Sequence, residues 1–360
     1  MITVLKAAGA TIANGALSFW YQGVDGQLAD VAAVSMQILA ADGVTEVQAK
    51  GALDVTDTPG SNRKGTGHYA GAWDSSTATA GMFVVRWFYK VASTDAEQSF
   101  DLPFELVAAA YPFGPHYTTI KSLRDEGLPG PTGSGAYSDA QAQSMIVRAS
   151  RYVEHFTGRI FEAVYKSISV DGTSARALLL QEAICAIEEV TIRDPMGGIA
   201  TIDDTLRVYN RHLTENLRDP DDRDSPKLEF IHGSDLAGVN EYPSGLAPRN
   251  YLRDLTWPRG RQNVGLVGLF GFTEPDGSFI GGTPALIQEA TKMLVFRNIQ
   301  RLAIRPSGTT AIIMEATRDQ QVQYAQPGAG GDNRARSFTG DPDIDQILVG
   351  FVRPPYIGSA

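Results

Sequence analysis

The chain has 360 residues, a formal net charge of −10 and a sequence pI near 5.0. Its 43% hydrophobic and 20% charged residues are typical of a folded protein, and the length is too great for one ordinary core, so we expect two or three domains. The acidic balance argues against a protein that grips nucleic acid tightly, and no apolar run approaches the roughly 20 residues that span a bilayer.

Residues 1–110 are predicted to form an immunoglobulin-like β-sandwich that folds by itself. Five segments rich in β-branched and aromatic residues are typical of strands, namely 16–22, 31–39, 67–73, 82–91 and 98–107. Apolar residues alternate along three of them, at Val34, Met36 and Ile38, at Val85, Trp87 and Tyr89, and at Phe100, Leu102 and Phe104. This alternation predicts one buried face for each strand.

Residues 111–136 are predicted to be a linker, because glycine and proline are frequent in 111–115 and in 128–135. A helix is predicted to follow, with Ser138 as its cap, Gln141 reaching back to the cap, and Gly158 in the left-handed turn that ends it. Its apolar stripe consists of Ala142, Met145, Ile146, Ala149, Tyr152, Val153 and Phe156.

Residues 160–282 are predicted to be a large β-rich insertion in a helical domain that spans 137–305. Strand candidates are 164–170, 184–192, 205–209, 227–231 and 264–272. Glycines 265, 268 and 271 recur every third residue in the last of these, which indicates bulges or close backbone approach. Cys185 lies in an apolar run and is predicted to be a buried, inert thiol.

A second helix is predicted to begin at Thr283, which caps it, and Pro284, which takes its first position. The stripe Ile287, Ala290 and Leu294, with Met293 beside it, can meet the stripe of the first helix, and we take Ile146, Val153, Phe156, Ile287 and Leu294 as the helical core.

Residues 306–360 are predicted to be an extended C-terminal arm. Asp341 and Pro342 start a short amphipathic helix with Ile344, Ile347, Leu348 and Phe351 on one face. Such a helix either docks on its own domain or serves as an arm for a neighbour. Under the second alternative the segment can be removed without loss of the fold, and its contact residues are Ile344, Ile347, Leu348, Phe351, Arg353, Pro354, Pro355 and Tyr356.

The order of three motifs resembles the head-tail connector, or head-completion adaptor, family of tailed phages. A helix ending in Thr157-Gly-Arg159 is followed by a β-rich middle, by the strand Trp257-Pro-Arg-Gly-Arg-Gln-Asn-Val264 and by a proline-started helix. The resemblance covers roughly residues 120–360, and the first hundred or so residues lie outside it.

The resemblance implies a structural virion protein without enzymatic activity, located in the neck and, during assembly, in the host cytoplasm. It implies a homo-oligomeric ring, usually twelve-fold, that docks on the portal protein and offers a platform for a tail or stopper protein. DNA would travel through the ring, and the negative charge predicts that it binds there only weakly. The C-terminal segment would engage a neighbouring ring.

The leading alternative is a β domain of a phage tail or baseplate that binds carbohydrate or another surface, since Trp20, Tyr21, Trp73 and Trp87 could stack on sugars or fill a sandwich core. An enzyme ranks third. The five scattered histidines favour no zinc site, and Asp219, Asp221, Asp222 and Asp224 lack the spacing of a calcium-binding loop. We therefore predict no catalytic residue, no cofactor and no metal.

Overall fold

The computed structural model divides the chain into two compact units. The first consists of Met1–Ala110, Ile160–Pro284 and Pro354–Ala360, and the second of Tyr111–Arg159 and Ala285–Arg353. The structure describes residues 2–5, 12–23, 27–56, 58, 61–75, 78–107, 115–132, 135–193, 199–201, 206–209, 223–230, 256–304, 314–317, 320–323, 339 and 341–352. The predicted domain boundaries stay predictions, and in this division the stretch Ile160–Pro284 groups with Met1–Ala110.

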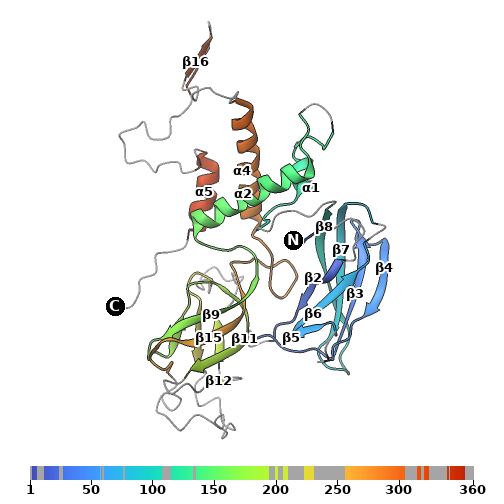
Figure 1. Cartoon of the computed structure of the whole chain (residues 1–360), viewed down its shortest axis with the longest axis vertical. Coiled ribbons are helices and arrows are strands. Elements are labelled where there is room, and N and C mark those ends of the chain that lie inside the picture. Colours follow the sequence, from blue (N-terminus) through green and yellow to red (C-terminus); the bar gives the residue numbers. More distant parts are fainter. Residues whose placement is uncertain are drawn as a thin grey trace. The chain divides into compact units, whose positions relative to one another are not determined.

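The N-terminal part of the first unit contains two sheets, drawn in blue to cyan in Figure 1. The larger sheet has the order β1 (Ile2–Leu5), β8 (Gln98–Val107), β7 (Gly81–Lys90), β3 (Ala33–Ala40) and β4 (Glu46–Ala52). The smaller sheet has the order β2 (Ile12–Trp20), β6 (His68–Trp73) and β5 (Arg63–Gly65). All pairings are antiparallel except the parallel pairing of β1 with β8.

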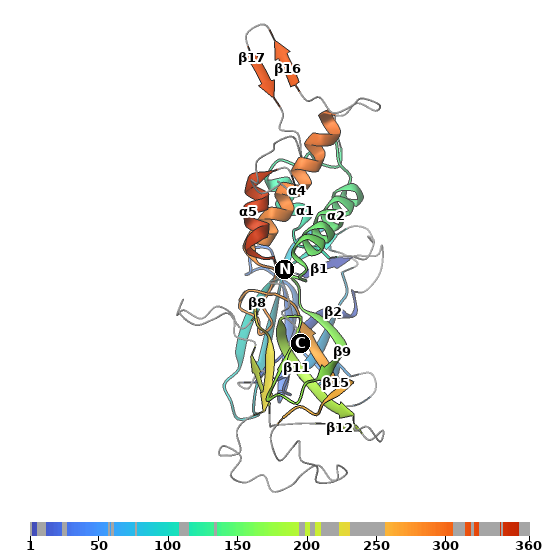
Figure 2. The ribbon, with the colours of Figure 1, turned by 90° about the vertical axis from the view of Figure 1, so that its left-hand side faces the viewer.

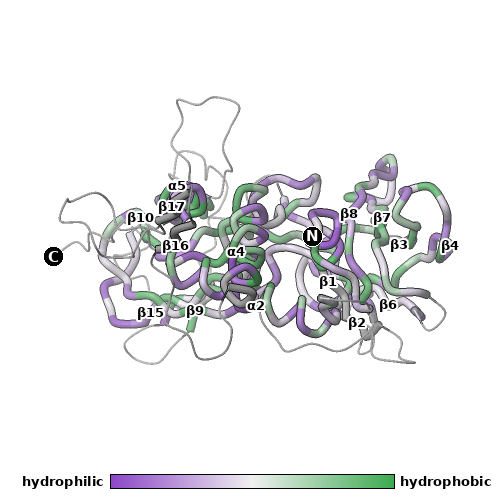
Figure 3. Tube along the Cα trace, turned by 90° about the horizontal axis from the view of Figure 1, so that it is seen from above, coloured by the Kyte–Doolittle hydropathy of each residue, from purple (hydrophilic) through white to green (hydrophobic). Residues whose placement is uncertain are grey.

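One hydrophobic core joins these two sheets, so this part is a β-sandwich; its immunoglobulin-like strand order stays a prediction. The alternation seen in the sequence sets the core, because Met36, Val85, Trp87 and Phe104 are almost fully buried whereas their neighbours along each strand are more exposed. Figure 3 shows this mixture of hydrophobic and hydrophilic residues along β3, β7 and β8. The strands β1, β4 and β5 were not predicted, since they are short or lack apolar alternation.

The second β part of the same unit also contains two sheets around one core. The four-stranded sheet has the order β12 (Ile199–Thr201), β11 (Ile184–Arg193), β15 (Gly260–Phe270) and β9 (Val164–Gly172). The three-stranded sheet has the order β10 (Ala177–Leu179), β14 (Lys227–Phe230) and β13 (Leu206–Tyr209). Ile187, Phe230 and Trp257 lie in the shared core.

The glycines of β15 and the turn after it allow close backbone approach, as their spacing predicted. A Cβ atom on Gly268 would lie 2.4 Å from the carbonyl oxygen of Ala186, and one on Gly271 would lie 2.1 Å from that of Glu162. The pairing of β11 with β15 also contains register shifts near Ala186 and between Ile187 and Glu189. A side chain at these positions would therefore push the paired strands apart.

The second unit contains α1 (Ile120–Asp125), α2 (Asp139–Thr157), α4 (Ala285–Ile304), α5 (Pro342–Gly350) and a hairpin of β16 (Met314–Thr317) and β17 (Gln320–Gln323). Helix α2 has the predicted ends: Ser138 and Gln141 form a capping box, and Gly158 is left-handed with φ 68°. Helix α4 begins one residue later than predicted, at Ala285. Helices α2, α4 and α5 contact one another, as Figures 1 and 2 show.

The predicted linker contains folded structure. Thr119 caps α1 by accepting a hydrogen bond from the backbone N–H of Ser122, and Ile120, Leu123 and Leu128 are buried. The Arg124 guanidinium also pairs with Asp139 at the start of α2. The prediction was wrong here because glycine and proline at both ends of the segment obscured a short capped helix between them.

Several predicted features lie outside the described residues: Arg353–Tyr356, the histidines His212 and His232, and the aspartates Asp219, Asp221 and Asp222. No helix in the part of the chain that the structure describes combines the length and the apolar character needed to cross a bilayer.

The close approach at Gly268 gives a direct test of the β11–β15 pairing. Gly268→Ala should lower the free energy of unfolding by roughly 1–3 kcal/mol, because its methyl group would meet the backbone of Ala186 and Ile187. Gly51→Ala is the matched control, since nothing lies within 4 Å of a Cβ at this strand position. Urea denaturation measures both, and equal stabilities of the two variants would contradict the pairing.

Candidate functional site

The C-terminal helix α5, the predicted contact segment, packs on its own unit. Asp341 caps it by accepting a hydrogen bond from the N–H of Asp343, and Pro342 follows at its first turn. Before the helix, the N–H and hydroxyl of Thr339 donate to Asp345 at 2.9 and 2.6 Å. Ile344 and Leu348 are fully buried, and α5 contacts both α2 and α4. The alternative of a helix docked on its own domain therefore describes this structure.

The burial of α5 changes which of its side chains can contact a partner. Ile347 and Phe351 are half-buried. Val349 and Val352, which were not among the predicted contacts, are 57% and 41% exposed. Because Ile344 and Leu348 are fully buried against the other helices, the structure does not favour the expectation that this segment can be removed without loss of the fold.

The predicted helical core is largely buried. Ile146, Val153 and Ile287 are fully buried and Leu294 nearly so, whereas Phe156 is half-buried and Tyr152 is exposed. The buried face of α2 is therefore shifted relative to the predicted stripe, because it also includes Gln143, Val147, Ser150 and Thr157.

Polar contacts hold the helices as well. Tyr117 donates its N–H to Ser150 at 3.2 Å and its hydroxyl hydrogen to Glu154 at 2.7 Å. Lys292 pairs with Glu126 and Glu289; burial opposes its charge, but these hydrogen bonds raise the pKa of Lys292 above its ordinary value.

A second candidate site is the seam, by which we mean the contact between the N-terminal sandwich and β11 within the first unit. The N–H of Leu28 donates to the carbonyl oxygen of Ile187 at 2.8 Å, and the side chain of Gln22 donates to the carbonyl oxygen of Cys185 at 3.0 Å. Leu28, Cys185, Ala186 and Leu269 form a small hydrophobic cluster there. This contact was not predicted from the sequence, because the pairing of segments so far apart in the chain leaves no local pattern.

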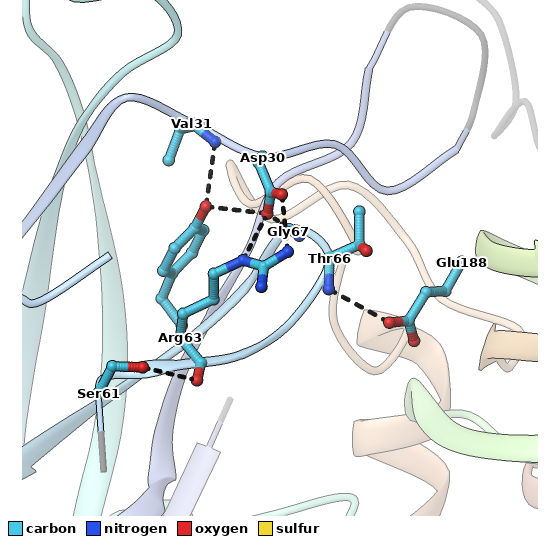
Figure 4. A network of polar contacts seen from close by, with 8 residues as sticks. Asp30, Val31, Ser61, Arg63, Thr66, Gly67 and Glu188 are labelled. Carbon is cyan, nitrogen blue, oxygen red and sulfur yellow. Dashed lines mark hydrogen bonds and ion pairs between the residues drawn. The ribbon is translucent and has the colours of Figure 1, made fainter. Parts of the chain in front are cut away.

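An aspartate positions the turn that completes the seam (Figure 4). Asp30 accepts hydrogen bonds from Arg63 at 3.1 and 2.8 Å, from the N–H of Gly67 at 2.9 Å and from the hydroxyl of Tyr69 at 3.2 Å. Burial opposes the ionisation of Asp30, but these bonds and the Arg63 charge lower the pKa of Asp30 below its usual value. The turn thus fixed directs the N–H of Thr66 toward Glu188 at 3.2 Å.

The geometry at Gly67 explains why this turn needs glycine. Its φ is +63°, and a Cβ atom there would lie 2.7 Å from the carbonyl oxygens of both Ala29 and Tyr21. Glu188, the partner of the turn, also accepts a hydrogen bond from the Tyr165 hydroxyl at 2.5 Å, and the pKa of Tyr165 is raised to about 12 by burial and by this carboxylate.

The aromatic residues considered for carbohydrate binding are engaged within the fold. Trp73 and Trp87 are buried in the sandwich core. The indole of Trp20 stacks on His68, with ring centroids 3.6 Å apart, and on Tyr165 at 5.5 Å. Tyr21 packs edge-on against Phe279 at 5.0 Å. These contacts favour the interpretation of the four residues as sandwich core and seam.

Two polar or ionisable side chains near the seam, Cys185 and Arg223, are buried. Burial raises the pKa of the Cys185 thiol to about 11, and the thiol donates to the carbonyl oxygen of Gly271 at 3.3 Å. Arg223 is buried beside it, donating to the carbonyl oxygen of Thr273 at 2.5 Å, with its guanidinium 4.2 Å from the Phe272 ring centroid. Among the residues that the structure describes, no three His, Cys, Asp or Glu side chains gather as metal ligands would.

Comparisons with known proteins give a weak structural likeness. No family model matches the chain, and no curated protein does. A chain of a solved structure described as the neck of an empty GTA particle computed with C6 symmetry is similar, with a TM-score of 0.31 and 16% identity. The match covers 53% of this chain and 81% of that one.

The neighbouring residues Leu348 and Val349 offer a matched test of how α5 packs. Leu348→Ala should destabilise the second unit by roughly 2–5 kcal/mol, because Leu348 is fully buried. Val349→Ala should change stability by at most about 0.5 kcal/mol, because its side chain is mostly exposed. Thermal unfolding of the full chain measures both, and similar losses would contradict the packing of α5.

His68 stacks on Trp20 and has a lowered pKa, so we predict that part of the free energy of unfolding is lost in acid. Burial, and to a lesser extent the charge of Lys64, lower the pKa of His68 from 6.5 to about 4. The unfolded chain therefore binds more protons between these pH values, so this stabilisation is complete above about pH 6.5 and is lost progressively as the pH falls toward 4.

His68→Phe keeps a ring on Trp20 but removes the titration. We expect its melting temperature to fall less steeply than that of the wild type between those two pH values. Parallel melting curves would contradict the assignment.

Proposed function

We propose that the chain is a structural virion protein of the head-tail adaptor type, which assembles into a twelve-membered ring on the portal protein and has no catalytic role. DNA passes through the ring, and a tail or stopper protein docks below it. The proposal rests on the resemblance of the sequence motifs to that family and on the structural roles of the residues that carry it.

The observation that supports the proposal best concerns the motif Trp257–Val264. Trp257 is fully buried and exchanges backbone hydrogen bonds of 2.9 Å with Ser174 and Ala175. Asn263 accepts from the N–H of Gly172 at 2.8 Å and donates to the carbonyl oxygen of Pro258 at 2.8 Å. The motif thus joins the end of β9 to the start of β15.

Two glycines make this junction possible. A Cβ atom on Gly260 would lie 2.6 Å from Cγ of Asn263, and one on Gly172 would lie 1.9 Å from the carbonyl oxygen of Pro258. The tryptophan, glycine and asparagine of the motif thus take part in one local structure, which supports the interpretation of the motif as a signature of a fold.

The two helices that carry the rest of the resemblance lie in one unit. Helix α2 comes before the β-rich stretch and α4 comes after it, and their buried residues Val153 and Ile287 belong to the same helical unit. This discontinuous helical unit fits the order of elements that the adaptor family implies. Fold alone does not define function, so the proposal needs a test of assembly.

Assembly in solution tests the proposal. Because the chain carries a large net charge, the test varies the salt concentration. Copies that each carry a charge of −10 repel one another, and raising the salt from about 0.01 M to about 0.15 M shortens the screening length from about 30 Å to about 8 Å. We expect a particle of about twelve times the 38.7 kDa chain mass to appear as salt rises.

Mass photometry measures this mass, and negative-stain images show whether the particle is a ring. The chain at low salt is the control, and added duplex DNA should leave the particle mass unchanged. A chain that stays monomeric at every salt and protein concentration would contradict the proposed ring.

A further inference from the structure

A structured loop, Thr273–Gly282, leaves the second β part of the first unit just before α4. Glu274 and Gly282 close it with two backbone hydrogen bonds of 2.8 Å. Inside the loop, Asp276 accepts from the N–H and hydroxyl of Ser278 at 2.9 and 2.5 Å, and Ser278 in turn accepts from the N–H of Gly281 at 3.0 Å. These bonds give the loop a defined conformation.

The base of the loop is anchored to the second β part. The hydroxyl of Thr273 donates to the carbonyl oxygen of Ile280 at 2.7 Å and lies 3.6 Å from the Cys185 sulfur. Ile280 packs against the cluster that contains Leu28 and Leu269. The loop therefore extends from the same body as β11.

The Phe279 ring, which precedes Ile280 in the loop, contacts four aromatic rings of the N-terminal sandwich. Its centroid lies 5.0 Å from that of Tyr21, 5.5 Å from Tyr89, 6.0 Å from Phe100 and 6.3 Å from Phe19, with interplanar angles between 74° and 89°. All four contacts are edge-to-face, the arrangement that the charge distribution of aromatic rings favours. We call these four sandwich residues the aromatic clasp.

The clasp and the seam share the segment around the end of β2, where Tyr21 of the clasp precedes Gln22 of the seam, but the clasp also includes residues of the larger sheet. The seam involves Gln22, Leu28 and Thr66, whereas Tyr89 and Phe100 of the clasp belong to β7 and β8 of the larger sheet. The contacts of Phe279 with β7 and β8 thus add to those of the seam and oppose rotation of the sandwich about it.

We propose that Phe279 is a latch that fixes the angle of the N-terminal sandwich on the second β part, and that its withdrawal from the aromatic clasp lets the sandwich pivot about the seam. Only Thr283 and Pro284 separate the loop from the first residue of α4. This inference does not depend on the proposed function.

Spin labels on the two parts of the first unit measure the pivot. Val44→Cys in the sandwich and Ile199→Cys in β12 place labels at side chains that are 81% and 64% exposed, and the buried Cys185 stays unlabelled. In the otherwise wild-type chain we expect a single narrow distance distribution. Phe279→Ala should replace it with a broad one, and Phe279→Tyr, which keeps the ring, should restore the narrow peak.

A second variant separates the latch from a purely structural role. Phe279→Leu keeps apolar bulk in the clasp but removes the ring, so we expect a broadened distribution while far-UV circular dichroism and amide exchange show both β parts still folded. A distribution that stays narrow in Phe279→Ala or Phe279→Leu would overturn the proposal. So would one that is already broad with Phe279 present, or unfolding of the sandwich in both variants.

Discussion

The backbone between Cys185 and Glu188 in β11 makes the contacts on which the larger unit depends. This run pairs with β15 in its own sheet, and at the same time the carbonyl oxygens of Cys185 and Ile187 accept hydrogen bonds from Gln22 and Leu28. Its register shifts occur in this same run, where the regular ladder with β15 is interrupted. Glu188 adds the third contact, to the Thr66 turn that Asp30 holds in place. A strand that belongs to one core thus also contacts the N-terminal sandwich, and the two β parts become one unit.

The same contacts bury Cys185 and neighbouring side chains at the seam. The Cys185 thiol is enclosed by the docked sandwich and by the turn after β15, and burial keeps the thiol protonated because an ion there would lack water. Arg223 is buried with its guanidinium against Phe272, and His68 is held neutral on Trp20. Cys185, Arg223 and His68 thus take part in packing within the first unit. The helical unit, held by its own core of Ile146, Ile287 and Leu348, carries the signature helices of that proposal.

Local signals predicted much of this structure, and long-range contacts account for what they missed. The capping box at Ser138, the left-handed Gly158 and the alternation of Val85 and Trp87 act within a few residues, so the sequence predicted them accurately. The docking of the sandwich on β11 joins residues more than 100 positions apart, and no periodicity records such a contact. The burial of Ile344 and Leu348 was left open because an amphipathic helix has the same pattern whether it covers its own core or a partner. The contact of Phe279 with the aromatic clasp was not predicted, because Phe279 lies in a loop with no repeating pattern.

The amide of Leu28 tests the central claim that β11 joins the N-terminal sandwich and the second β part in one unit. Native-state hydrogen exchange can compare this amide, which donates to Ile187, with the amides of β11 and β15 and with the exposed turn amide of Val44. If the seam holds as described, Leu28 will exchange as slowly as the sheet amides, with the same free energy of opening. If Leu28 exchanges as fast as Val44 while the β11–β15 amides stay protected, the sandwich is not docked on β11 and the account is wrong.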